Sequence, residues 1–469
     1  MEDAVCDPLE AASRQELGAA YQSLTFLATQ MAAEVEERRA ALLAKLNGGI
    51  EIGCGGSKLD MRRLSPGCRL CVEGHWSCLF INGRCNADCF YCPTGQDETG
   101  LPTTNSISFQ HPSDYAEYLE HFGFRGASFS GGEPLLTPGR TLAFLRTVKR
   151  RFGARLHTWL YTNGTLLKPD LVLQLRDAGL DEIRFDIGAI GYSLKPAAMA
   201  VGVIPTVTVE IPAVPEEGAL LREKLIEMAN LGVDHLNLHQ LRVTPYNLPK
   251  ILHRGYTFLH GEKVTILESE LTALELLVFG KERGIDLPIN YCSFVYKNRY
   301  QKVAARRRGA EVMAKPFEAI TGSGHIRTLG LVGSEKLLQK QVEQFLKSGA
   351  TPDQFSLQAS RERLFFSPDL WSAVLWPDFD LAISYGTATI RTGISYRVPF
   401  SEFRFKSGRK VFVERGSSGP EIVLSGDDVA MFERQFLRDV LPAEPFVVDE
   451  QWAKIKLCER IPQGLQVYG

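Results

Sequence analysis

Residues 80–93 read FINGRCNADCFYCP and place Cys85, Cys89 and Cys92 in a C-x3-C-x2-C arrangement directly after an apolar run. Three thiolates on one short loop can bind three irons of a 4Fe-4S cubane and leave the fourth iron open to another ligand. A structural zinc knuckle is the plain alternative for closely spaced cysteines. The spacing predicts a metal-binding loop, and the apolar run before it predicts the strand that carries the loop.

Outward from this loop, short apolar runs alternate with amphipathic stretches. The runs are LFING, GASFSGGE, LHTWLYTNG, EIRFDIGA, TVTVEIPAV and HLNLHQLRV, and helical patterns cover residues 114–122, 140–152, 169–178, 217–230 and 268–283. This rhythm predicts successive βα units with parallel strands. Six units predict an α/β fold, a partial (β/α)6 TIM-like barrel whose reactive groups lie at the carboxyl ends of the strands.

We expect three regions along the 469 residues. Residues 1–75 would hold a helix, with an amphipathic pattern from about 10 to 47, followed by a cysteine-rich metal loop. Residues 76–290 would form the barrel. Residues 291–469, where strand-like and helix-like patterns mix, would form an α+β domain that covers or binds the substrate.

Charge and composition favour no particular partner. A formal net charge of -2 gives no overall field that would attract nucleic acid or an anionic membrane. The N-terminus is acidic, and no apolar run reaches the length of roughly 18 residues that a membrane span requires. We therefore expect a cytoplasmic protein without a membrane partner, and we consider nucleic acid a weak alternative.

Most of the ten cysteines lie close together in the sequence. Seven of them fall between Cys54 and Cys92, in a chain without an export signal, which favours metal binding over disulfides. The other three, Cys6, Cys292 and Cys458, stand apart from this group. For these three we expect uncoordinated thiols, because a lone cysteine is more often a small apolar side chain than a ligand.

With the segment SGGEP at 130–134, the cysteine triad makes residues 76–290 resemble the radical S-adenosylmethionine (SAM) superfamily. The resemblance implies a 4Fe-4S cluster on the triad that reduces SAM and yields a 5′-deoxyadenosyl radical. It also implies that the backbone of Tyr91 lies near the adenine. Gly131, Gly132 and Glu133 would bind the amino group of SAM, since residues without a side chain permit a close approach.

Polar residues at later strand ends match the same superfamily more loosely. The resemblance implies that they face SAM, whereas capping or packing inside the barrel is the structural alternative. These residues are Thr162, Asn163, Asp186, Glu210 and His239.

Upstream of the triad, Cys54, Cys68, Cys71 and Cys78 form a C-x13-C-x2-C-x6-C pattern. Four thiolates can close one tetrahedral site, which favours an additional iron or zinc ion. Uncoordinated thiols and a second iron–sulfur cluster are the alternatives. Cys78 lies in the first predicted strand and could simply be buried there.

The whole pattern also resembles a branch of the superfamily that includes the methanogenesis marker enzyme, an arginine C-methyltransferase that acts on methyl-coenzyme M reductase with cobalamin. The chain contains no D-x-H-x-x-G cobalamin signature, so the motif does not support cobalamin. We expect C–H modification, with methylation as one form, of a peptide or protein. A flavodoxin or ferredoxin would donate the electron.

Three alternatives stay open at this point. A basic run could form a cationic helix face for an acidic peptide, a phosphate-bearing substrate or RNA, although such runs are usually solvated. The run consists of Lys297, Arg299, Lys302, Arg306, Arg307 and Arg308. The second alternative is an enzyme that modifies tRNA or a small molecule, and the third is a non-catalytic metal-binding scaffold.

Overall fold

A computed structural model describes residues 8–60, 63–376, 378–438 and 449–468. The chain divides into two compact units. Unit 1 holds residues 1–301 and 463–469, and unit 2 holds residues 302–462. The expected functional division at residues 75 and 290 stays a prediction. No helix among the described residues is both long and apolar enough to cross a membrane.

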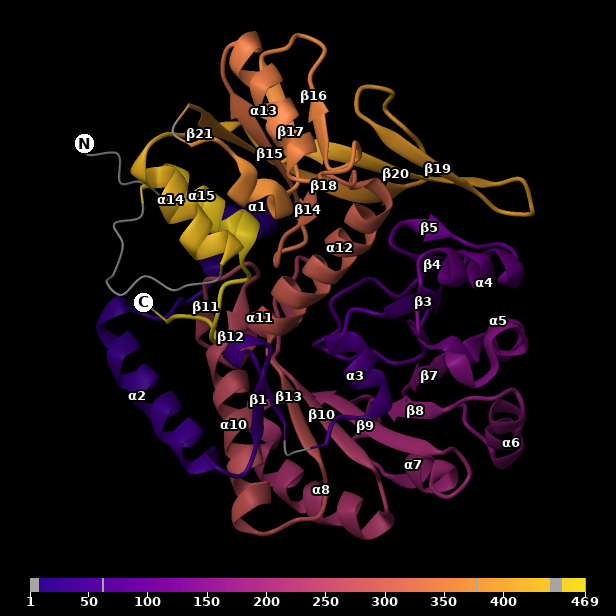
Figure 1. The fold of residues 1–469 in the computed structure, drawn as a ribbon. Helices are drawn as coiled ribbons and strands as arrows, with labels where there is room; N and C mark the ends of the chain where they lie inside the picture. Colours follow the sequence, from indigo (N-terminus) through magenta and orange to yellow (C-terminus); the bar gives the residue numbers. More distant parts are fainter. Residues whose placement is uncertain (1–7, 61–62, 377, 439–448, 469) are drawn as a thin grey trace. The chain divides into compact units, whose positions relative to one another are not determined.

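Unit 1 is built on a curved sheet of parallel strands, each followed by a helix that crosses back to the start of the next strand (Figure 1). The strands are β3 (Trp76–Asn82), β6 (Gly126–Gly131), β7 (His157–Thr162), β8 (Glu182–Phe185), β9 (Thr206–Pro212), β10 (His235–His239) and β13 (Ile289–Cys292). The crossover helices are α4 (Pro112–His121), α5 (Pro138–Phe152), α6 (Pro169–Asp177), α7 (Lys195–Ala200), α8 (Gly218–Leu231) and α10 (Leu267–Glu282). The predicted α/β partial barrel is confirmed.

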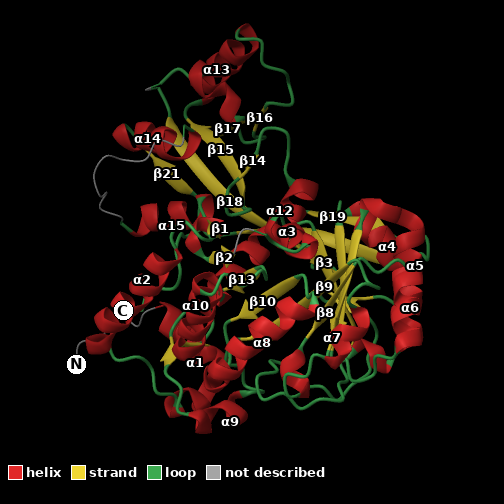
Figure 2. Cartoon of the chain, turned by 90° about the horizontal axis from the view of Figure 1, so that it is seen from below, coloured by secondary structure: helices red, strands yellow, loops and turns green. Residues whose placement is uncertain are grey.

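Alternation along the strands separates a polar interior from an apolar exterior. Arg184, Glu210 and His239 face the inside of the barrel, where they line a cavity. Their neighbours Ile183 and Val209 are fully buried and point to the opposite face, because successive side chains of a strand alternate. Helices surround this outer face, as the red ribbons in Figure 2 show. Apolar side chains thus pack between the sheet and its helices, and polar side chains face the inside of the barrel.

The barrel contains one parallel strand more than the six predicted. β13 pairs in parallel with β10 and brings Tyr291 and Cys292 into the sheet. Its four residues are all buried, but so short a run after helix α10 gives little periodic signal. The N-terminal strands β1 (Glu51–Gly53) and β2 (Lys58–Asp60) extend this edge, and β2 pairs antiparallel with β13, opposing Lys58 to Cys292. At the other edge lie β4 (Thr103–Thr104) and β5 (Ile107–Ser108).

The N-terminal segment does not form the continuous helix expected from about residue 10 to 47. Helix α1 (Pro8–Leu17) ends at Gly18, whose φ of +57° lies in the left-handed region. Helix α2 (Thr29–Leu46) begins after an extended stretch in which Phe26 pairs with Phe258 of β11 (Phe258–Leu259). The break exists because this stretch contributes to the sheet pairing of β11 and β12 (Thr265–Ile266).

Helix α3 (Pro66–Val72) carries two of the upstream cysteines against the barrel. Ser65 caps it by accepting a hydrogen bond from the N–H of Cys68 at 3.2 Å, and Pro66 occupies its first turn. The N–H of Gly67 donates to Glu182 of β8 at 3.0 Å. A β-carbon at Gly67 would collide with the side-chain ends of Glu182 and Arg184, so a larger residue would displace this ion pair.

Unit 2 is an antiparallel sheet with helices, the α+β architecture predicted for the C-terminal region. The strand order is β16-β17-β15-β18-β20-β19, with β14 on β15 and β21 on β18. The strands are β14 (Ala319–Ile320), β15 (Ile326–Val332), β16 (Phe355–Leu357), β17 (Arg363–Phe366), β18 (Asp380–Arg391), β19 (Phe400–Arg404), β20 (Lys410–Ser417) and β21 (Ile422–Leu424). The helices are α12 (Lys302–Met313), α13 (Glu335–Lys347), α14 (Asp427–Phe432) and α15 (Glu450–Glu459). Its apolar core includes Phe345, Phe366 and Phe432.

Candidate active site

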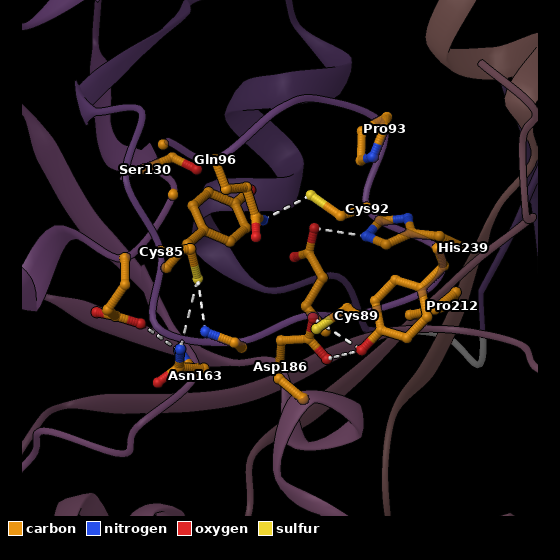
Figure 3. A pocket seen from close by; sticks show the side chains of 18 of the residues that line it. Cys85, Cys89, Cys92, Pro93, Gln96, Ser130, Asn163, Asp186, Pro212 and His239 are labelled. Carbon is orange, nitrogen blue, oxygen red and sulfur yellow. Dashed lines mark hydrogen bonds and ion pairs between the residues drawn. The ribbon is translucent and has the colours of Figure 1, made fainter. Parts of the chain in front are cut away.

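All twelve residues that the sequence assigns to the cluster and to SAM line one cavity of about 310 Å³ in unit 1. They come from the loop after β3 and from the carboxyl ends of β6, β7, β8, β9 and β10 (Figure 3). They are Cys85, Cys89, Cys92, Tyr91, Gly131, Gly132, Glu133, Thr162, Asn163, Asp186, Glu210 and His239. The fold therefore brings together side chains that lie up to 154 positions apart in the sequence.

The three triad sulfurs each have polar neighbours. The Sγ of Cys92 accepts a hydrogen bond from Nε2 of Gln96 at 2.7 Å, and the Sγ of Cys85 accepts one from Nδ2 of Asn163 at 3.8 Å. Burial raises the pKa of Cys89 to about 12, and the negative charge of Asp186 adds to the effect. Gln96 was not predicted from the sequence, because a glutamine in a loop carries no motif signal.

The two glycines of SGGEP serve the contact with the triad loop. The N–H of Gly132 donates to the carbonyl of Asn82 at 2.9 Å, and the N–H of Glu133 donates to the carbonyl of Arg84 at 2.8 Å. A β-carbon on Gly131 would collide with the Asn82 carbonyl, and one on Gly132 with the Arg84 carbonyl. Glycine is thus needed here for backbone-to-backbone packing, besides any role in the approach of a ligand.

The buried carboxylate of Glu133 joins the ends of two strands. It accepts hydrogen bonds from the N–H of Asn163 at 2.7 Å and from Oγ1 of Thr162 at 2.9 Å. A third comes from the N–H of Leu135 at 2.9 Å. Burial raises the pKa of Glu133, although these donors act in the opposite direction. Glu133 therefore positions Thr162 and Asn163, which also line the cavity.

Asp186, at the end of β8, contacts the tyrosine of the triad loop. The hydroxyl of Tyr91 donates to Oδ1 of Asp186 at 2.9 Å and to Oδ2 at 3.1 Å. Burial raises the pKa of Asp186 to about 6. The carbonyl of Tyr91 in turn accepts a hydrogen bond from Nδ2 of Asn247 at 3.2 Å, which fixes the loop on its other side.

Glu210 and His239 form part of an ion-pair network inside the barrel. Nε2 of His239 lies 2.6 Å from Oε1 of Glu210, and Nη1 of Arg184 lies 2.7 Å from Oε2. Burial raises the pKa of Glu210, but the Arg184 guanidinium and the contact with His239 outweigh burial and hold it well below its usual range. Both oxygens of Glu210 thus already contact protein side chains.

The upstream cysteines do not assemble as the sequence spacing suggested. A second cavity of about 150 Å³ is lined by Cys68, Cys71 and Cys292, whereas Cys54 and Cys78 do not line it. Cys292 therefore does not stand apart, as expected, because the unpredicted strand β13 carries it inward. Cys458 lies in the apolar core of unit 2, and Cys6 lies outside the described residues. Within the part of the chain that the structure describes, no three His, Cys, Asp or Glu side chains converge as ligands of one metal ion.

The residues of the basic run are divided between the two units: Lys297 and Arg299 belong to unit 1, and the other four belong to unit 2. Lys297 lines both cavities of unit 1, and Arg299 donates to the carbonyls of residues 463 and 464. Arg306 and Arg307 donate to carbonyls of residues 323 and 321 within unit 2, and Arg308 is buried. Arg299, Arg306 and Arg307 thus bind backbone carbonyls within their own units.

Comparison with known proteins agrees with this geometry. The model of the radical SAM superfamily matches residues 79–195. A protein of Methanocaldococcus jannaschii, provisionally named a glycyl-radical enzyme activating enzyme, is 30% identical over 295 residues, which cover 60% of this chain and 77% of that protein. The GTP 3′,8-cyclase of Heliobacterium modesticaldum is 30% identical over 142 residues, 30% of this chain and 42% of the cyclase.

Among solved structures, SuiB of Streptococcus suis bound to S-adenosylmethionine is 14% identical, covers 64% of this chain and 66% of SuiB, and gives a TM-score of 0.34. The family model and the archaeal relative define the class of this protein. The chain belongs to the radical SAM superfamily, and it is a radical SAM enzyme.

Proposed function

We propose that the chain binds a 4Fe-4S cluster on Cys85, Cys89 and Cys92, cleaves SAM reductively, and uses the resulting radical for C–H modification of a peptide or protein. The observation that carries this proposal is the single cavity of about 310 Å³ that contains all three triad sulfurs and the polar strand ends. Such a cavity falls within the size range of small-molecule sites.

The donor set fits the cluster. Three thiols share a loop of eight residues, and neutral amides of Gln96 and Asn163 are placed to donate to thiolate sulfur. When bound, the cluster would supply one electron to the sulfonium of SAM and release methionine with a 5′-deoxyadenosyl radical. Among the described residues, only these three cysteines line the cavity, which would leave one iron for SAM.

The residues around the triad fit SAM, which joins an amino acid to a nucleoside through a cationic sulfonium. Asp186 presents a carboxylate beside Tyr91, where ribose hydroxyls or a cation can bind. The carboxylate of Glu133 accepts three hydrogen bonds from protein donors, so we infer that it acts on SAM mainly by positioning Asn163 and by its negative charge. Arg242 and Lys297 also line the cavity and could pair with the SAM carboxylate.

A protein or peptide substrate is supported by the name of the archaeal relative, since activation of a glycyl-radical enzyme is an action on a protein. The match to GTP 3′,8-cyclases favours a small molecule as the second candidate, although it spans less than half of those enzymes. We retain a flavodoxin or ferredoxin as electron donor, and methylation as one form of the modification. Cobalamin has no support in the residues of this chain.

Anaerobic reconstitution with iron and sulfide, followed by SAM and a reductant, tests the proposal. We expect release of 5′-deoxyadenosine, and none from a variant that carries Cys85→Ala. Cys458→Ala, in the core of unit 2, serves as the matched control and should retain the activity. Peptide, tRNA and metabolite pools added separately then identify the substrate class from the one that raises deoxyadenosine release. Reconstituted protein that cleaves no SAM would contradict the proposal.

A further inference from the structure

The second cavity in unit 1 gathers cysteines from three separate elements. Cys68 and Cys71 come from α3, and Cys292 comes from the end of β13. Cys68 and Cys292 are 4% and 6% exposed, so both thiols belong to the interior. Protein interiors are filled to the density of organic crystals, so ordinary packing of these side chains would leave little empty space between the sulfur atoms.

Each of these three sulfurs contacts an N–H or O–H group. Nζ of Lys58 lies 2.8 Å from the Sγ of Cys292, and Nδ2 of Asn237 lies 3.2 Å from the Sγ of Cys68. The hydroxyl of Tyr296 lies 3.3 Å from the Sγ of Cys71. Such contacts stabilise thiolates, and hydrogen bonds to sulfur tune iron–sulfur clusters.

A fourth thiol comes from the turn that precedes β2. Cys54 has a φ of +52°, and Gly55 and Gly56 follow with φ of +59° and +88°. A non-glycine residue in this region costs about 1–2 kcal/mol, so the surrounding structure must impose the conformation. The Cys54 thiol lies close enough to interact electrostatically with Lys58, Cys71 and Cys292. The Cys54 thiol therefore lies near Cys71 and Cys292.

Cys78, the fourth ligand expected from the sequence, has a different environment. Neither Cys54 nor Cys78 lines the cavity. The Cys78 thiol hydrogen-bonds to the side chains of Ser128 and Ser130 on the neighbouring strand β6, whereas the Cys54 thiol interacts with Lys58 and Cys292. We therefore define the Lys58 cysteine cluster as Cys54, Cys68, Cys71 and Cys292, without Cys78.

The dimensions and charges of the site indicate its occupant. A lone zinc or iron needs four sulfurs about 2.3 Å from one point, and no described set of side chains converges in this way. A cavity of about 150 Å³ is several times the roughly 30 Å³ share of one liquid water. Lys58 and Lys297 both line it, and two ammonium groups would balance a tetrathiolate cluster of net negative charge.

We propose that the Lys58 cysteine cluster binds a second iron–sulfur cluster, with Cys292 rather than Cys78 as its fourth ligand. This inference goes beyond the proposed function, because it concerns a centre with ligands outside the SAM cavity. The new cluster is enclosed by α3, β2 and β13, and we infer that it transfers or stores electrons and does not bind SAM.

The test uses the full chain with the triad removed, C85A/C89A/C92A, reconstituted anaerobically with iron and sulfide. We expect equal iron and acid-labile sulfide, about two or about four of each per chain, as in clusters held by four cysteines. Absorbance and the paramagnetic signal after reduction should confirm a cluster. Adding Cys292→Ala should abolish it, whereas adding Cys78→Ala, the same change at a neighbouring barrel cysteine, should leave it in place.

The single variant Cys292→Ala with an intact triad checks folding, since it should still bind the triad iron. Three results would overturn the proposal: no iron in the triad-free chain, a single metal ion without sulfide, or loss of the cluster with Cys78→Ala instead of Cys292→Ala. Because the triad is absent from the main test, these results do not depend on whether the chain cleaves SAM.

Discussion

Unit 1 contains two groups of cysteines whose surroundings differ. The triad lies on one loop after β3, is partly exposed, and faces a cavity large enough for a nucleoside. Its sulfurs contact neutral amides, such as that of Gln96. The Lys58 cysteine cluster is assembled from the turn at Cys54, helix α3 and strand β13, and an ammonium group contacts one of its sulfurs.

Cysteine can therefore serve two kinds of iron site, one that admits SAM and one that is enclosed by the protein. An iron site that must admit SAM needs an open coordination position and access from solvent, which a loop at the strand ends provides. An enclosed site with no room for a substrate is suited to holding or passing electrons. The first kind of site can be formed by a local motif, whereas the second depends on the fold that brings distant residues together.

The largest expected effect concerns the triad. Replacing Cys89 by alanine should reduce SAM cleavage to the uncatalysed background, because two thiolates do not hold the cubane that delivers the electron. Deoxyadenosine release measured by chromatography checks this, with Cys458→Ala as the control. Cleavage at more than a trace level would show that the triad is not the cluster site, and the contrast between the two groups would disappear.

Thiol reactivity in the metal-free protein should differ by on the order of 100-fold or more between the triad and the two buried thiols of Cys68 and Cys292, because buried thiols react only after local or global opening. Anaerobic alkylation followed by mass spectrometry would give a rate for each cysteine. Cys85, Cys89 and Cys92 should be modified first, and Cys68 and Cys292 last, in line with their exposure. Equal rates would mean that the Lys58 cysteine cluster is open to solvent.

The third effect is the acid sensitivity of the contact that holds α3 on the barrel. Burial raises the pKa of Glu182, but Arg184 and His157 outweigh burial and hold it at about 2. A carboxyl group whose pKa is lowered on folding stabilises the folded protein at pH values above its unfolded pKa of 4.5. This contribution is lost as the pH falls toward 2. Removing one partner of such a buried pair costs about 3 kcal/mol, or about 150-fold in the unfolding equilibrium.

Glu182→Gln should therefore lower the melting temperature at pH 7 and flatten the loss of stability between pH 4.5 and pH 2. Thermal unfolding across this pH range provides the measurement. Glu73→Gln is a matched control, because Glu73 also pairs with an arginine but is about half exposed. A wild-type protein whose stability is constant between these pH values would contradict the assigned role of Glu182.

Most of the barrel could be predicted from the sequence because its signals are local. The apolar runs and the helical periodicity correspond to six parallel strands and their helices, and the motif residues all line one cavity. The physical reason is that parallel strands end at the same edge, so residues after successive strands must meet there. The roles of these residues in binding SAM stay predictions.

The seventh strand and Cys292 could not be predicted in the same way. β13 has four residues, too few for a periodic pattern, and its sequence INYC carries no metal motif. The partnership of Cys292 with α3 depends on the pairing of β2 with β13, a contact between residues more than 200 positions apart. The same applies to Gln96 beside Cys92, which only the folded loop identifies.

The smallest expected effect separates the binding of SAM in the triad cavity from the binding of iron by the triad. Glu133→Gln should weaken SAM binding about tenfold, the loss expected when a hydrogen bond to a charged group of about 1.5 kcal/mol is disturbed. The triad iron should remain, because the hydrogen bonds of the Glu133 carboxylate come from Leu135, Thr162 and Asn163 and not from a cysteine. Thr141→Val, which removes a buried hydroxyl bonded to the Pro134 carbonyl outside the cavity, is the matched control. Equilibrium binding of SAM, with iron content measured on the same samples, separates the two effects, and a parallel loss of both would place Glu133 in the support of the cluster itself.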